Sequence, residues 1–90
     1  MPYIKDRDVI DEKLHPIVQY VAYEADQSKL AGELNYIITR LLKSAYFIPQ
    51  DAKYVDYNEA IGILECAKLE LFRAFVGPYE EKKRQENGDV

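Results

Sequence analysis

Apolar residues recur at spacings of three and four from Lys29 to about Tyr46, with polar residues between them. This spacing places the apolar side chains on one broad stripe of an α-helix. The pattern therefore predicts a helix over this range that is buried on one side, with Ser28 as its N-cap. The stripe consists of Leu30, Leu34, Ile37, Ile38, Leu41, Leu42 and Ala45.

A weaker helical pattern precedes this helix and contains a proline. Proline costs about 3 kcal/mol inside a helix but is tolerated at the first helical position. We therefore expect a short helical turn that ends near Leu14 and a second helical segment from Pro16 to about Ala25, with His15 at the junction. The apolar residues of this pattern are Val9, Ile10, Leu14, Ile17 and Val21.

The second half of the chain predicts two more helices after a loop of about ten residues, "FIPQDAKYVD". Asp56 and Glu59 have the spacing of a capping box, which predicts a helix from Tyr57 to about Val76. The dipeptide Gly77-Pro78 is typical of a helix end. The next residues, "PYEEKKRQENG", then predict a short fourth helix, with an i,i+4 pair of Glu80 and Arg84 and a C-cap at Asn87-Gly88.

The third predicted helix carries apolar residues on two sides. Most of them share one face, but Leu69 and Val76 project from the opposite side. A single domain of three main helices and a short fourth has too little protein to cover both sides. We therefore expect an all-α domain over residues 1–90 that forms a homo-oligomer.

Composition and charge narrow the classes of partner. The net charge is −4 and the isoelectric point is about 4.9, which argues against nucleic acid, because phosphate binding needs clustered Lys and Arg. No stretch has the length and apolar character of a signal peptide or a membrane span, and the sequence has one cysteine. We expect a cytoplasmic protein without a membrane partner.

Familiar catalytic motifs are missing from the sequence. It has no glycine-rich phosphate loop, no paired-cysteine zinc spacing, no HExxH and no G-x-S-x-G. Glu65 points to a different face of the helix from Glu59 and Glu70, so no metal site is expected there. We expect His15 to be a surface or junction residue and Cys66 a small buried hydrophobe, and no motif identifies a cofactor.

Polar residues with helical spacing are the remaining candidates for a site. Glu65 with Lys68 and Glu70 with Arg73 have i,i+3 spacing, typical of solvated pairs, although burial of the helix would make them part of a site. On the second helix, Asn35, Thr39 and Tyr46 flank one side of the apolar stripe, and Arg40 flanks the other with Tyr36 and Lys43. These residues either hydrogen-bond at the core boundary or bind a ligand, and an arginine beside aromatic rings suits an anion.

Two segments resemble a family of small uncharacterised proteins from bacterial, archaeal and phage genomes. They are "GELNYIITRLL" and "EAIGILECAKLELFRAFVGPYEEKKRQENGDV", which match the family patterns L-N-Y-x-I-T-R-L-L, G-x-L-E-x-x-K-x-E, P-Y-E-x-K-K and a terminal N-G-D-V between Gly32 and Val90. The resemblance implies a defined C-terminal segment and no particular activity. The chain departs from the pattern at Phe72-Arg73-Ala74, where the family has Tyr-Arg-Arg.

Together these patterns lead to three functional hypotheses. The first is a non-enzymatic homo-oligomer that holds a small anionic ligand, such as a nucleotide, in a polar cluster. The second is a protein-interaction or regulatory module, and the third is a metal-assisted enzyme acting on a phosphate-containing substrate through Glu65 or Glu70. The residues of the predicted polar cluster are Asn35, Thr39, Arg40, Glu65, Lys68, Arg73, Tyr79, Lys83 and Asp89.

Overall fold

The computed structural model describes residues 5–88, and within this range the protein is all-α, with no strand. This confirms the predicted fold class. The chain divides into two compact units, Met1–Asp51 and Ala52–Val90, which we describe separately. Within residues 5–88, no helix combines the length and apolar character that a bilayer span requires.

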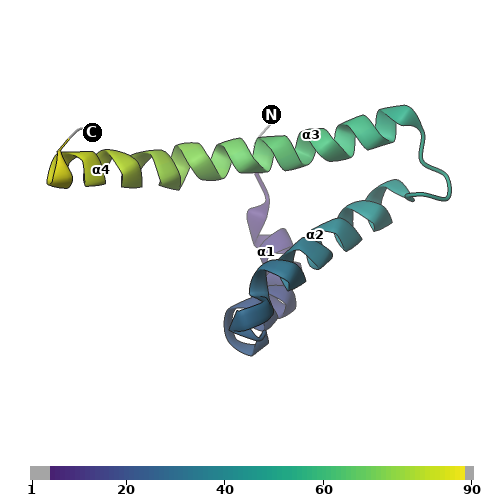
Figure 1. Cartoon of the computed structure of the whole chain (residues 1–90). Helices are drawn as coiled ribbons and strands as arrows, with labels where there is room; N and C mark the ends of the chain where they lie inside the picture. Colours follow the sequence, from purple (N-terminus) through teal and green to yellow (C-terminus); the bar gives the residue numbers. More distant parts are fainter. Residues whose placement is uncertain (1–4, 89–90) are drawn as a thin grey trace. The chain divides into compact units, whose positions relative to one another are not determined.

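The first unit is a pair of helices joined by a short connection (Figure 1). Helix α1 spans Arg7–Gln19 and continues into a π-helical turn at Tyr20–Glu24. A 3-10 turn at Gln27–Lys29 then leads into α2, which spans Leu30–Tyr46. The helix predicted from Lys29 to about Tyr46 is thus confirmed to within one residue.

The predicted break before Pro16 is wrong, because α1 runs through this proline. Pro16 has no N–H to donate to the carbonyl of Glu12. The side chains around it are exposed, so water can hydrate that carbonyl and the cost of the missing bond falls. The irregularity follows one turn later, where the N–H of Ala25 donates to the carbonyl of Tyr20 at 2.8 Å, the i→i−5 bond of a π turn.

The entry into α2 is capped by Asp26, and the prediction of Ser28 as the N-cap is wrong. One carboxylate oxygen of Asp26 accepts from the backbone N–H of Ser28 at 3.0 Å and from its hydroxyl at 2.7 Å. These two bonds lower the pKa of Asp26, the hydroxyl bond most. Ser28 therefore donates to the cap, and the carboxylate two residues earlier accepts.

Helix α2 ends at a left-handed residue. Phe47 adopts φ 55° and donates its N–H to the carbonyl of Lys43, which closes the last turn. Residues 47–53 form the loop to the second unit and include a cis peptide bond at Ile48-Pro49. The loop is shorter than predicted, because the next helix begins three residues early.

The second unit is one continuous helical segment from Tyr54 to Asn87 (Figure 1). It consists of α3 (Tyr54–Leu71), a π-helical turn (Phe72–Val76) and α4 (Gly77–Asn87). The predicted start at Tyr57 is wrong, because Asp56 lies inside the first turn. Its carboxylate reaches back and accepts from the N–H of Lys53 at 2.9 Å.

The predicted helix end at Gly77-Pro78 is also wrong. Gly77 is right-handed helical, with φ −58°, and its N–H donates to the carbonyl of Phe72. This π turn widens the helix just before Pro78. In a regular α-helix the proline ring would clash with the carbonyl of the residue four positions earlier. The predicted fourth helix is confirmed as α4, and it ends as predicted at Gly88, which has φ 82°.

Very little of the described chain is buried. Within residues 5–88 the buried apolar side chains are two alanines, Ala25 and Ala60. Large apolar side chains are exposed on the helices of both units; Val55, for example, is 66% exposed and Phe75 is 68% exposed. The stripe predicted on α2 is half-buried at Leu30, Leu34, Ile37 and Leu42 and exposed at Ile38, Leu41 and Ala45.

Candidate functional site

The first unit contains an open groove between its two helices. The groove comprises two adjoining depressions with volumes of about 470 Å³ and 390 Å³, which share Tyr20, Tyr36 and Ile37. Its lining is Pro16, Ile17, Tyr20, Lys29, Gly32, Glu33, Tyr36, Ile37, Arg40 and Leu41.

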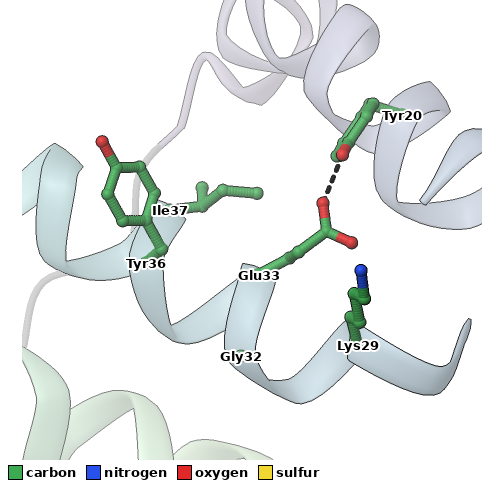
Figure 2. A pocket seen from close by; sticks show the side chains of 6 residues that line it. All are labelled: Tyr20, Lys29, Gly32, Glu33, Tyr36 and Ile37. Carbon is green, nitrogen blue, oxygen red and sulfur yellow. Dashed lines mark hydrogen bonds between the residues drawn. The ribbon is translucent and has the colours of Figure 1, made fainter. Parts of the chain in front are cut away.

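A hydrogen bond crosses one end of the groove. The hydroxyl of Tyr20, at the start of the π turn, donates to the carboxylate of Glu33 on α2 (Figure 2). This bond and the negative charge of Glu33 both disfavour tyrosinate, so they raise the pKa of Tyr20 above its ordinary value of 10.0. The pair links the π turn after α1 to helix α2.

The α2 wall combines aromatic, cationic and small residues. Figure 2 shows Lys29, the last residue of the 3-10 turn, and Glu33 on α2 projecting toward Tyr20, with Tyr36 and Ile37 one turn further along α2. Between them Gly32 carries no side chain, and a Cβ placed there would meet no atom within 4 Å. The floor of the groove is therefore open at this point.

Arg40 occupies the other end of the groove. Its guanidinium donates to the hydroxyl of Tyr36 at 3.4 Å, as the spacing of four residues predicts. Arg40 also lines a smaller depression of about 250 Å³ with Lys43, Ser44 and Phe47. A guanidinium beside an aromatic ring can bind a carboxylate or phosphate in a planar, two-bond geometry.

The groove therefore has an apolar floor, two aromatic rings and cationic side chains at its edge. Ile17, Ile37 and Leu41 supply the floor, and Lys29 and Arg40 supply the positive charge. Such a surface can bind a ligand that has a flat apolar part and a negative charge.

Of the predicted cluster residues on α2, one lines this groove. Arg40 does, but Asn35 and Thr39 lie on the adjacent face of the helix, where the hydroxyl of Thr39 donates to the amide oxygen of Asn35 at 3.3 Å. This contact is the boundary hydrogen bond that the sequence left open as an alternative.

The predicted residues on α3 form exposed pairs along the helix. Lys68 contacts Glu65 at 2.8 Å, and Arg73 contacts Glu70 at 2.6 Å. The side chains of all four residues are exposed or half-exposed, so each pair contributes about 0.3–0.5 kcal/mol. Within this unit they behave as the solvated i,i+3 pairs that the sequence predicts.

Two further predicted residues lie together on α4. The ammonium of Lys83 lies 5.7 Å from the centre of the Tyr79 ring and 3.5 Å from the carboxylate of Glu86. Both line a depression of about 330 Å³ near the end of the helix. Along a continuous helix Lys83 is about 27 Å from Glu65, so one small ligand on one chain cannot contact both. Asp89 lies outside the described residues.

The prediction that Cys66 is buried is wrong, since its side chain is exposed on α3. It lies on the side of the helix that carries few large apolar residues. Within residues 5–88 no three His, Cys, Asp or Glu side chains are close enough together to hold a metal ion. His15 contacts Gln19 one turn along α1, with 3.3 Å between their side-chain nitrogens.

Sequence reasoning did not find Glu33, Lys29 or Gly32 as lining residues. Tyr20 and Glu33 are thirteen residues apart, and their contact depends on how the connection between the helices turns. The π turn that aims Tyr20 toward α2 has no simple sequence signal. Tyr20 and Glu33 share one feature in the sequence, since each lies within two helical turns of the connection between the helices.

Comparison with models of protein families identifies a family for this chain. The model of a family described as a domain of unknown function (DUF6899) matches residues 1–90. The chain belongs to this family. The match spans the whole of this DUF6899 chain, including the first unit and its groove, whereas the resemblance noted above begins at Gly32. No curated protein and no solved structure matches the chain.

Proposed function

We propose that this protein is a non-enzymatic homo-oligomer that binds a small anionic, nucleotide-like ligand in the α1–α2 groove. The observation that carries the proposal is the combination of two tyrosine rings, an apolar floor and Arg40 in one groove. A nucleotide has a flat aromatic base and a charged phosphate, which match these two kinds of surface.

The ligand would be held by complementary contacts at the two ends of the groove. Tyrosine rings stack on bases, and such stacking contributes about 1–3 kcal/mol per base in single-stranded nucleic-acid binding. The Arg40 guanidinium would bind the phosphate, because charge-assisted bonds to phosphate are about twice as strong as neutral hydrogen bonds. Lys29 would add positive charge near the Tyr20 end.

The proposed oligomer follows from the apolar side chains that the single chain leaves exposed. Large apolar side chains such as Leu71 and Phe75 are more than half exposed in the chain. Burial of apolar surface contributes about 25 cal/mol per Å², so a further partner would stabilise the fold considerably. A second copy of the chain is the partner that is always present.

The proposed ligand site is tested by isothermal titration of the intact protein with AMP, ATP and cyclic nucleotides. We expect binding to at least one of them, and at least about tenfold weaker binding by Arg40→Ala, because a charge-assisted bond is lost. Lys13→Ala is the matched control: it removes the same charge from an exposed site on α1 outside the groove. Lys83→Ala reports whether the α4 pair contributes.

Two results would overturn the ligand proposal. One is the absence of binding heat for every nucleotide. The other is equal loss of affinity in Arg40→Ala and Lys13→Ala, which would mean that only net charge matters.

A second candidate function is a protein-interaction module. It is favoured by the exposed tyrosines on both units, among them Tyr23 at 79% and Tyr54 at 80%, since tyrosine is enriched at protein interfaces. This hypothesis predicts that one protein from the native host co-purifies with the chain in stoichiometric amount. Recovery of the chain alone would argue against it.

A further inference from the structure

The carboxylate of Glu33 lies at one end of the α1–α2 groove and keeps acceptor capacity for a ligand. Glu33 is half-buried on α2, and one of its oxygens accepts from the hydroxyl of Tyr20 (Figure 2). A carboxylate has about four lone-pair sites, so this bond leaves room for further donors. A ligand that contacts Glu33 therefore needs N–H or O–H groups at that end.

The two ends of the groove differ in charge, which orients an anionic ligand. At one end Lys29 and Glu33 project into the same part of the groove (Figure 2), so their charges offset each other. At the other end Arg40 and Lys43 line the adjoining depression, whose lining within residues 5–88 has no carboxylate. Like charges repel and opposite charges attract, so a phosphate is favoured at the Arg40 end. The base of a nucleotide then lies toward Glu33.

The spacing of the two ends fits one nucleotide. Glu33 and Arg40 are seven residues apart on α2, so they share a face and lie about 10.5 Å apart along the helix axis. Tyr36 and Ile37 lie between them and line both depressions. An extended nucleoside monophosphate has a comparable length from the edge of its base to its phosphate. Its middle would then contact the aromatic and apolar side chains between the two charged ends.

We propose that Glu33 makes the groove selective for guanine nucleotides by accepting the N1–H and 2-amino donors of the base, while Arg40 binds the phosphate. Guanine presents these two N–H groups side by side on one edge, which matches the two oxygens of a carboxylate. Adenine, cytosine and uracil each present an acceptor beside a donor on that edge, and the acceptor would face the carboxylate. The inference rests on the nucleotide-binding function proposed above and specifies which base the site accepts.

The cation at the phosphate end has donors to spare for this ligand. The guanidinium of Arg40 has five N–H donors, and its contact with the hydroxyl of Tyr36 at 3.4 Å uses one of them. The remaining donors can bind two phosphate oxygens in a planar geometry. Glu33 and Arg40 therefore recognise opposite ends of the same molecule, one as acceptor and one as donor.

Isothermal titration of the full-length chain with GMP, IMP and AMP tests this selectivity. We expect GMP to bind at least about tenfold more tightly than AMP, because AMP replaces a charge-assisted bond with an acceptor that faces the carboxylate. IMP keeps N1–H and lacks the 2-amino group, so its dissociation constant should lie between those of GMP and AMP. AMP binding as tightly as GMP, or IMP binding as tightly as GMP, would overturn the two-donor contact.

The substitution Glu33→Gln tests the role of the carboxylate itself. Glutamine has the same size, and its side-chain oxygen can still accept from Tyr20. We expect the ratio of the GMP and AMP dissociation constants to come within about threefold of one, because the negative acceptor is lost. Glu12→Gln is the matched control, since it removes the same charge from an exposed site on α1 outside the groove, and it should keep the native ratio. Helix content by circular dichroism confirms that both variants are folded.

The outcomes separate this inference from the proposed function. If GMP and AMP bind equally and Arg40→Ala weakens both, the nucleotide-binding function stands and the selectivity is wrong. If GMP is preferred and Glu33→Gln keeps the native ratio, Glu33 is not the residue that selects the base. If no nucleotide binds, the proposed function is wrong and the selectivity with it.

Discussion

Tyr20 shows how one side chain fixes local geometry in this protein. Its hydroxyl reaches from the π turn after α1 to Glu33 on α2, and this bond raises the pKa of Tyr20. A raised pKa in the folded state means that the neutral hydroxyl is the stabilising form. The contribution is therefore fully present below pH 10.0 and disappears as the pH rises through the higher folded-state pKa.

Tyr20→Phe should remove this pH dependence. The variant should melt at a lower temperature than the native chain at pH 7, and the difference should shrink as the pH rises above 10.0, because the native chain loses the bond there. Thermal melts from pH 7 to pH 11 measure the difference. Tyr23→Phe, which changes a neighbouring exposed tyrosine, is the control, and a constant difference for Tyr20→Phe across this range would contradict the account.

Capping residues illustrate what the sequence could and could not predict at this scale. Ser28, Asp56 and Glu59 were interpreted as capping residues, whereas Asp26, which caps the turn before α2, was not. The choice between them depends on backbone geometry: Asp26 accepts from Ser28, and Asp56 accepts from Lys53 inside the first turn. A polar residue near a helix start predicts a cap but does not assign the donor and the acceptor.

At the scale of elements, apolar periodicity predicted the helices more accurately than the prolines predicted where helices end. The stripe on α2 predicted that helix within one residue, because a long amphipathic repeat has one interpretation. Pro16 and Pro78 were interpreted as boundaries, yet both lie within helical segments that absorb them next to π turns. A π turn forms where some backbone carbonyls have no intrahelical N–H donor, and no simple sequence pattern predicts which carbonyls these are.

The site could be predicted only in part for the same reason. Local pairs such as Arg40–Tyr36 and Glu65–Lys68 follow directly from helical spacing and were foreseen. The groove between α1 and α2 needs residues from two helices, and the angle between these helices is set by the connection. Periodicity within one helix contains no information about that angle.

The two helical glycines give a test at this scale. Gly32 and Gly62 are both in open space, so Gly32→Ala should stabilise its helix by about 1 kcal/mol through helix propensity alone. Gly62→Ala should have the same effect in an isolated chain.

Thermal melts of both variants measure this effect. We expect each substitution to raise the melting temperature, because the new methyl group meets no atom of the chain. A lower melting temperature for either variant would contradict the open space at that glycine.

At the scale of the whole molecule, the exposed apolar surface is the feature that most needs a partner. The described residues bury two alanines among their apolar side chains, while large side chains on every main helix face outward. A chain of this length already buries a smaller fraction of its surface than larger domains do. Assembly with a second copy would supply the missing burial and would place two grooves in one particle.

Native mass spectrometry of gently purified protein tests this account most directly. The account predicts a particle of twice the 10.5 kDa chain mass at low micromolar concentration, and a retained anionic ligand would appear as an additional defined mass. A particle of one chain mass at every concentration would contradict the homo-oligomer, and with it the proposed function.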